Sequence, residues 1–204
     1  MHNLSERQYD RHARNVMPWL PRDAATDREQ EIIREVLEKK AGAHFGKGCF
    51  VAPDANVYTD IFYLGERSWV ASGAIIRGNV RVGADCSINS YAHIAGRVTI
   101  GNGCRIASLA SIYGFNHGIS RTDIYMMGQG ITSIGVTLKE DVWVGAGAII
   151  VDGVEIGAHS IVAAGAVVTK SFGDFNVIGG NPARTLHVRT AETPNGPQET
   201  DSKV

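Results

Sequence analysis

Aliphatic side chains recur at every sixth position over much of this chain of 204 residues. Helices repeat about every 3.6 residues and strands about every two, so a period of six indicates a higher-order coil. With isoleucine, leucine and valine at roughly a fifth of the chain, nine such matches in a row would arise by chance on the order of once in a million. The first run is Leu64, Val70, Ile76, Val82, Ile88, Ile94, Ile100, Ile106 and Ile112, and the second is Leu138, Val144, Ile150, Ile156, Val162 and Val168.

A second repeating position lies two residues before each aliphatic rung and holds only small side chains. Its members in the first run are Ser68, Ala74, Val80, Cys86, Ala92, Val98, Cys104 and Ala110. We interpret Cys86 and Cys104 as small core residues, because buried thiols pack like small apolar groups. They are eighteen residues apart, so they stack on adjacent coils if three six-residue sides make one turn. The three cysteines lack CxxC spacing, which argues against a disulfide framework or a zinc knuckle.

Net charge and the distribution of apolar residues limit the kinds of partner expected for this protein. The formal net charge is -1, so no strong field favours nucleic acid or a membrane surface. The N-terminus lacks an apolar leader, and no stretch approaches the length needed to span a membrane. We therefore expect a soluble cytoplasmic protein.

We expect a short helical segment over residues 1–47. Ser5 with Gln8, and Thr26 with Glu29, resemble capping boxes that open two helices. The first helix should stop before Pro18. The second should bury one apolar face against an end of the coil stack and end near Gly42. That face comprises Ile32, Ile33, Val36 and Leu37.

Glycine often follows an aliphatic rung, as at Gly65 and Gly83. We attribute this to the backbone freedom that a tight turn requires. At the other end of the chain, residues 189–204 show no apolar periodicity and are expected to form a disordered tail.

The period of six breaks once. Ile112 and Leu138 are twenty-six residues apart, which is not a multiple of six, so a segment of about 113–137 leaves the stack. Long excursions inside regular arrays are usually functional. This one opens on Tyr113-Gly114-Phe115-Asn116-His117-Gly118.

Two stretches resemble a known family. The run VWVGAGAIIVDGVEIGAHSIVAAGAVVTKSF at 142–172, followed by VIGGNPAR at 177–184, resembles the hexapeptide-repeat acyltransferases. Those nearest in pattern are the sugar O-acetyltransferases (galactoside, maltose and nodulation-factor types) and the xenobiotic acetyltransferases. The resemblance implies an all-β domain over 48–188, a left-handed parallel β-helix with three hexapeptides per coil. It also implies a homotrimer whose active sites lie between neighbouring subunits.

The same resemblance implies transfer of acetyl from acetyl-CoA to a hydroxyl of a sugar or similar acceptor, without a metal. His117 lies where the family's catalytic histidine is found, and a neutral imidazole near pH 7 can act as general base. Asn116 either bonds the acceptor hydroxyl or is a turn residue that orients the loop. Tyr113, Tyr125 and the two following methionines either line the acceptor site or pack on a neighbouring subunit.

On the donor side, Trp143 matches the tryptophan that the family places beside its active site. The backbone amide of Ala146 is the expected oxyanion donor. Ala164 is a further contact along the coenzyme A groove. Lys170 and Arg184 match the basic residues that meet the nucleotide phosphates, and Pro182 either packs against adenine or closes the last turn.

Two other functions stay open. Residues 73–96 faintly resemble the γ-class carbonic anhydrases, with His93 as a metal ligand. However, Asn79 replaces the aspartate and Thr122 stands five residues after His117, where three-histidine ligation would need a histidine. The third hypothesis is that the protein is a non-catalytic scaffold. The acceptor, O- or N-acylation, the acyl chain and the role of the N-terminal helices are left open.

Overall fold

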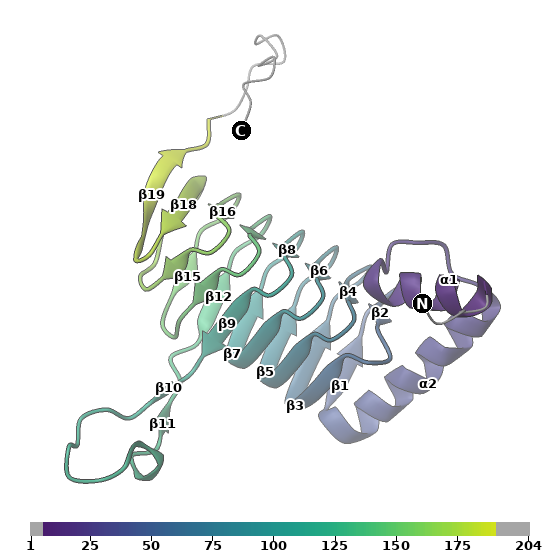
Figure 1. The fold of residues 1–204 in the computed structure, drawn as a ribbon, viewed down its shortest axis with the longest axis horizontal. Coiled ribbons are helices and arrows are strands. Elements are labelled where there is room, and N and C mark those ends of the chain that lie inside the picture. The colour runs from purple at the N-terminus through teal and green to yellow at the C-terminus, as the bar shows by residue number, and fades with distance from the viewer. Residues whose placement is uncertain (1–5, 191–204) are drawn as a thin grey trace.

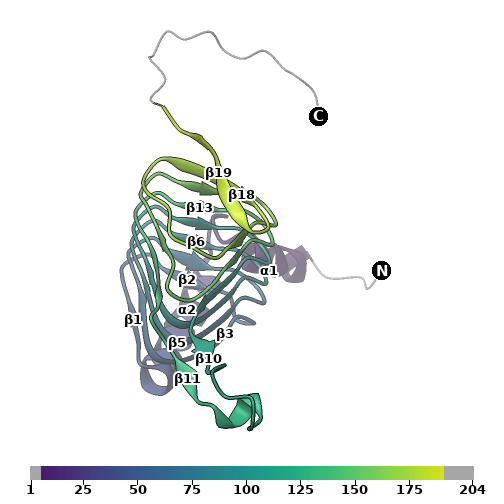
Figure 2. The same ribbon diagram turned by 90° about the vertical axis from the view of Figure 1, so that its left-hand side faces the viewer.

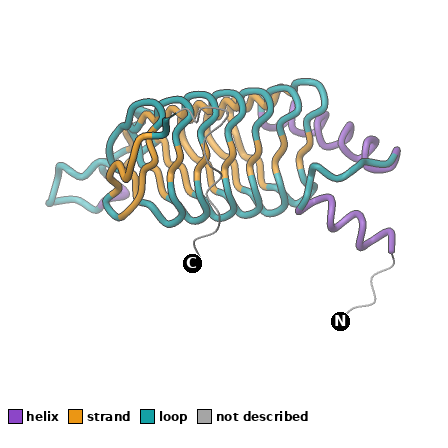
Figure 3. The backbone as a smooth tube through the Cα atoms, turned by 90° about the horizontal axis from the view of Figure 1, so that it is seen from above, coloured by secondary structure: helices purple, strands orange, loops and turns teal. Residues whose placement is uncertain are grey.

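The computed structural model describes residues 6–190. Short parallel strands stack coil upon coil into a β-helix, and two helices cover its N-terminal end (Figure 1). Seen from above, strands alternate with turns at the corners of every coil (Figure 3). The fold is thus a parallel β-helix of hexapeptide repeats preceded by a short helical segment, which confirms the predicted fold class.

Three columns of aligned strands make the three sides of the β-helix. The first side holds the first halves of β3 (Asn56–Leu64), β5 (Ile75–Val82) and β7 (His93–Ile100), then β9 (Ser111–Gly114), β14 (Ile149–Ile150) and β17 (Val167–Val168). The second side holds β1 (Ala43–Phe45), the second halves of β3, β5 and β7, β12 (Val136–Leu138) and β15 (Glu155–Ile156).

The third side runs the whole length of the stack. It holds β2 (Phe50–Val51), β4 (Trp69–Val70), β6 (Ser87–Ile88), β8 (Arg105–Ile106), β13 (Trp143–Val144), β16 (Ile161–Val162) and β18 (Asn176–Gly180). The final strand, β19 (Ala183–Val188), turns back antiparallel to β18. Viewed along the stack, successive coils nest behind one another (Figure 2).

The strand register explains the period of six. Ile76 pairs with Ile94, and Ile94 pairs with Ile112, each eighteen residues on. The aliphatic rungs therefore meet along the axis as three inner columns, and every one of them is at most 4% exposed. The small positions of the first run are buried as well. Burial of each aliphatic side chain contributes about 1.5–3 kcal/mol, so these columns are the main source of stability.

Cys86 and Cys104 lie in the core on adjacent coils, as predicted, and they also make hydrogen bonds. The Sγ of Cys86 is 3.0 Å from the carbonyl oxygen of Gly101, and the Sγ of Cys104 is 3.1 Å from that of Lys139. Ser68 in the same column donates to Gly83 O at 2.7 Å. The column therefore supplies side-chain donors to carbonyl groups at one corner.

The glycines that follow the rungs have a different cause from the one expected. Neither Gly65 nor Gly83 has a positive φ. A Cβ on Gly65 would lie 2.3 Å from the backbone carbon of Gly83 in the next coil. The expectation of backbone freedom was wrong here, because close approach between coils excludes a side chain at these positions.

Helix α1 spans Glu6–Val16 and ends before Pro18, as predicted, and α2 spans Ala24–Ala41 with Gly42 as its C-cap. The N-cap of α2 is Asp23, whose carboxylate accepts from Thr26 N at 2.8 Å. The predicted start at Thr26 was therefore three residues late, since an aspartate preceding the threonine already satisfies the first turn. The predicted Ser5 box falls partly outside the described residues.

Helix α2 covers the first coil with part of the predicted apolar face. Ile33 and Leu37 pack against the core, whereas Ile32 and Val36 are exposed. The buried Gln30 bonds both the N–H and the C=O of Val51, each at 2.8 Å. These two bonds satisfy the open edge of β2, so α2 closes the stack with a polar as well as an apolar contact.

The excursion from the stack is shorter than the predicted 113–137. Tyr113 and Gly114 still pair with Ala95 and Gly96, and β12 re-enters the stack beside β7. The projecting segment, which we call the arm, is therefore residues 115–134. It contains β10 (Asn116–His117), the short 3-10 helix η1 (Met126–Gly128) and β11 (Ile131–Thr132).

Only residues 189 and 190 of the predicted C-terminal tail are described by the structure. Residues 191 onward of the predicted tail lie outside the described part of the chain. Within residues 6–190 no helix is both long and apolar enough to cross a membrane.

Candidate active site

His117 is exposed at the root of the arm. It lies on β10, which pairs antiparallel with β11 so that His117 faces Ile131 and Asn116 faces Thr132. Gly118 N donates to Gly130 O at 3.0 Å and continues the ladder. The hairpin projects from the β-helix in both side views (Figures 1 and 2).

Asn116 serves its own loop. Its Oδ1 accepts a hydrogen bond from the backbone N–H of His117 at 3.0 Å. This is a local side-chain to backbone bond of the kind that stabilises turns. Of the two readings made from the sequence, the geometry favours the one in which Asn116 orients the loop.

An aromatic array leads from the coil surface to His117. The rings of Tyr113 and Phe115 are 6.4 Å apart at 89°, and those of Phe115 and His117 are 6.1 Å apart at 75°. The guanidinium of Arg77 lies 5.8 Å from the centre of the Phe115 ring. Sequence reasoning missed Phe115 and Arg77, although the spacing of two from 113 to 117 is a strand pattern that places these three rings on one face.

His93 lies at the base of this array. Its Nδ1 is 3.3 Å from the hydroxyl of Tyr113, and its buried Nε2 has no hydrogen-bond partner within residues 6–190. Burial, and secondarily the charge of Arg77, lowers the pKa of His93. Burial thus favours the neutral imidazole, and the side chain is half-buried. Among residues 6–190, no group of three His, Cys, Asp or Glu side chains is arranged to hold a metal.

The donor-side residues gather at another place, along the third side and its following corner. Trp143 lies on β13 between Arg105 and Ile161 and is 53% exposed. Ala146 and Ala164 occupy matching positions on adjacent coils, and Gly165 N donates to Ala146 O at 2.9 Å. The Ala146 N–H donates no hydrogen bond within the described chain. Small exposed residues here leave the backbone open to a ligand.

The C-terminal candidates divide into two groups. Pro182 follows a cis peptide bond in the turn between β18 and β19, and β18 pairs with β16 just before Ala164. Arg184 is exposed, and its Nη1 bonds the carbonyl of Ala183 at 2.8 Å. Lys170 lies beyond β17, with its Nζ 5.5 Å from the Phe172 ring, so it belongs to a different corner.

One chain does not bring its two candidate groups together. Among the described strands, β10, which carries His117, pairs with β11 alone, whereas Trp143 belongs to the third side of the β-helix. The proposed base and the donor-side corner are thus presented by different parts of the surface.

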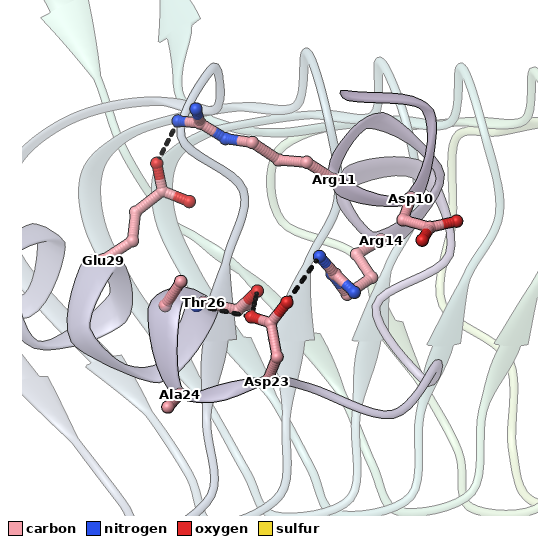
Figure 4. Close-up of a pocket in the computed structure, with 8 residues that line it drawn as sticks. Asp10, Arg11, Arg14, Asp23, Ala24, Thr26 and Glu29 are labelled. Atoms are coloured by element: carbon pink, nitrogen blue, oxygen red, sulfur yellow. Dashed lines mark hydrogen bonds and ion pairs between the residues drawn. The ribbon is translucent and has the colours of Figure 1, made fainter. Parts of the chain in front are cut away.

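Two cavities, of about 540 and 560 Å³, are lined by residues of neither group. One cavity of about 540 Å³ lies between the two helices at the other end of the stack (Figure 4). Its charged side chains largely pair with each other: Arg14 contacts Asp23 at 3.2 Å, and Arg11 contacts Glu29. Self-pairing of this kind is typical of helix-to-helix packing at a surface.

Comparison with known proteins supports the repeat assignment. The family model described as bacterial transferase hexapeptide (six repeats) matches two blocks, residues 79–114 and 135–170, on either side of the arm. No curated protein matches the sequence.

Solved structures share the fold at low identity. The N-acyltransferase AntD of Bacillus cereus, solved with dTDP and 3-hydroxybutyryl-CoA, is 22% identical with a TM-score of 0.67, covering 76% of this chain and 87% of that one. A hexapeptide-repeat acetyltransferase of Vibrio cholerae is 20% identical with a TM-score of 0.54, covering 90% and 93%. A hexapeptide transferase family protein of Anaplasma phagocytophilum is 19% identical with a TM-score of 0.56, covering 72% and 80%.

Proposed function

We propose that this chain, whose repeats match the bacterial transferase hexapeptide family, is a CoA-dependent O-acetyltransferase. It transfers acetyl from acetyl-CoA to a hydroxyl of a sugar or saccharide-like acceptor. One observation carries the proposal: an exposed histidine stands at the root of the arm, between the two matched blocks of repeats.

Two groups of the protein, the His117 imidazole and the backbone N–H of Ala146, would carry out the proposed chemistry. The acceptor oxygen attacks the thioester carbonyl while His117 Nε2 or Nδ1 takes its proton, and coenzyme A leaves as the thiol after that proton is returned. The tetrahedral intermediate carries an oxyanion, which a fixed N–H donor stabilises. The Ala146 N–H, which has no hydrogen-bond partner among residues 6–190, supports its assignment to that role.

The proposal includes a homotrimer in the cytoplasm. Since His117 and Trp143 lie on different parts of one chain, a cleft between two copies would bring the arm of one beside the Ala146–Ala164 corner of the other. Coenzyme A would lie along that corner, with its nucleotide near Pro182 and Arg184. Lys170 is proposed as a further phosphate contact. Exposed apolar side chains on the arm, among them Tyr125 and Met127, suit burial against a neighbour.

The acceptor panel should include amines. One structure of AntD contains dTDP-4-amino-4,6-dideoxyglucose and coenzyme A, so a nucleotide-linked amino sugar is a rational competitor of a plain sugar hydroxyl. Release of free thiol from acetyl-CoA, followed with sugars, nucleotide sugars and amino sugars in turn, identifies the acceptor. A requirement for stoichiometric zinc after chelator treatment would instead favour the anhydrase reading.

Replacing His117 by alanine tests the mechanism. Loss of general-base catalysis should lower kcat by about 10²–10⁴-fold, with little change in thermal stability because the side chain is exposed. His44→Ala is the matched control, since His44 is an exposed histidine on β1 that stacks on Tyr63 far from the arm. Near-normal turnover by His117→Ala would refute the assignment.

A further inference from the structure

Both ends of the arm rest on one residue of the preceding coil. A Cβ on Gly114, where the arm departs, would lie 2.0 Å from the carbonyl oxygen of Arg97. A Cβ on Gly135, where it returns, would lie 3.1 Å from the same oxygen. The two glycines allow the chain to leave and re-enter the stack at the same point above Arg97.

The Arg97 side chain, on the preceding coil, binds the segment by which the arm returns to the stack. Its Nη2 donates to Ser133 O at 2.9 Å and also to Ile134 O. Ser133 Oγ in turn donates to Gly114 O at 2.6 Å and joins the two ends of the arm. One guanidinium nitrogen thus binds two consecutive carbonyl groups, because it carries two N–H donors.

Asp152 holds the same segment from the following coil. Its carboxylate accepts from Ile134 N at 3.1 Å and from Gly135 N at 2.7 Å. The Arg97 guanidinium therefore binds the carbonyl groups of residues 133–134, and the Asp152 carboxylate binds the N–H groups of residues 134–135. Hydrogen bonds to charged groups are roughly twice as strong as neutral ones, so this arrangement is a clamp on the arm root.

The clamp lies next to His117. Ser133 directly follows Thr132, and β11 pairs with β10 so that Ile131 faces His117. We propose that Arg97 and Asp152 are positioning residues that fix the direction of the arm and thereby the place of His117. The role assigned to His117 rests on the proposed function, whereas the clamp on the arm rests on the contacts alone.

Limited proteolysis tests the clamp without any assay of activity. Arg121 is the only lysine or arginine within residues 115–134, so tryptic cleavage there reports the mobility of the arm. Arg97→Met and Asp152→Asn should each raise the rate of cleavage after Arg121 by about tenfold, because opening governs cleavage of native chains.

Matched controls come from another corner of the β-helix. Arg67 and Asp85 also bridge adjacent coils, at 2.7 Å, and they lie away from the arm. Arg67→Met and Asp85→Asn should leave cleavage after Arg121 at the wild-type rate. Equal cleavage in the clamp variants and the controls would overturn the proposal. The two clamp variants are independent, so one that fails to fold leaves the other to decide.

Kinetics then test positioning. A shift of the base by about 1 Å costs on the order of 10²-fold in rate, so Arg97→Met should lower kcat while the KM for acetyl-CoA stays constant. Arg97→Lys, which keeps the positive charge and the N–H donors on a single nitrogen but lacks the planar guanidinium, should recover part of kcat. Faster cleavage with unchanged kcat would refute the positioning role. Full activity of His117→Ala would refute the proposed function and leave the proteolysis result standing.

Discussion

His93 shows how one side chain acquires properties that its sequence position conceals. In the sequence it is one polar residue in an alternating coil, with no partner in view. In the structure its Nδ1 lies beside the Tyr113 hydroxyl, and its Nε2 is buried with no partner in the described part of the chain. Both burial and the charge of Arg77 favour the neutral form and lower its pKa.

This lowered pKa predicts a dependence of stability on pH. The unfolded chain, in which histidine titrates near pH 6.5, takes up a proton that the folded chain resists. Stability supported by neutral His93 is therefore present above about pH 6.5 and is lost as the pH falls through the lower folded pKa. His93→Gln, which keeps a hydrogen-bonding group, should lose less Tm than the wild type between about pH 7.5 and 5.5. An equal loss in both proteins, measured by thermal unfolding, would contradict this.

The sequence predicted the environment of a single residue correctly where that residue occupied a position of the six-residue repeat. Cys86 and Cys104 were correctly read as core residues because every neighbour in their column is small. Phe115 was missed although its spacing of two from Tyr113 and His117 is visible in the sequence, whereas its contact with Arg77 comes from another coil. Contacts across coils carry no local signal.

Glycines at the corners of the coils occur for two different reasons, close approach to the next coil and a positive φ. Gly65 has ordinary backbone angles but lies against the next coil. Gly103 has a φ of 72° and open space, with its nearest contact at 3.8 Å. Matching corner positions at Asp85 and Asp141 carry side chains at φ of 59° and 52°, so that corner tolerates residues other than glycine.

Two substitutions distinguish these cases. Gly65→Ala should destabilise the protein by about 1–3 kcal/mol or more, because its methyl group would overlap backbone that cannot move freely. Gly103→Asn should cost less than about 1 kcal/mol, since asparagine adopts the left-handed conformation comparatively easily. Chemical denaturation of both variants measures the difference, and a Gly65→Ala protein as stable as Gly103→Asn would disprove the close-approach explanation.

Helix boundaries show the limit of element prediction. The stop of α1 before Pro18 and the C-cap of α2 at Gly42 were predicted, because proline and glycine act through the backbone itself. The start of α2 was not, since Asp23 and Thr26 are both good capping residues and only the hydrogen bond from Thr26 N to Asp23 decides between them.

For the whole molecule, the columns of aliphatic rungs are the reason the coils stack. Each rung is inward, whereas exposed residues stand beside some of the rungs, as Thr99 does beside Ile100. Repeat arrays gain stability from each interface between neighbouring coils. A defect inside one coil therefore weakens two interfaces.

A charge placed in the column should unfold the protein. Ile106→Asp buries a carboxylate without a partner at a position that is 0% exposed, a change that costs several kcal/mol. Thr99→Asp, which places the same charge on the outer surface of a strand, should leave the cooperative unfolding transition nearly unchanged. Circular dichroism and solubility compare the two, and a soluble Ile106→Asp that melts cooperatively would contradict the stacking account.

The sequence by itself determined the class of β-helix, the stacking of the small residues and the place of the interruption, because these depend on a periodic pattern that each coil repeats locally. It also singled out His117 within that interruption. Only the tertiary structure decided that the arm is residues 115–134, that Arg97 and Asp152 grip its root, and that His117 and Trp143 are held apart in one chain. Those relations join residues of different coils, and their distances are set by the stacking of the whole molecule.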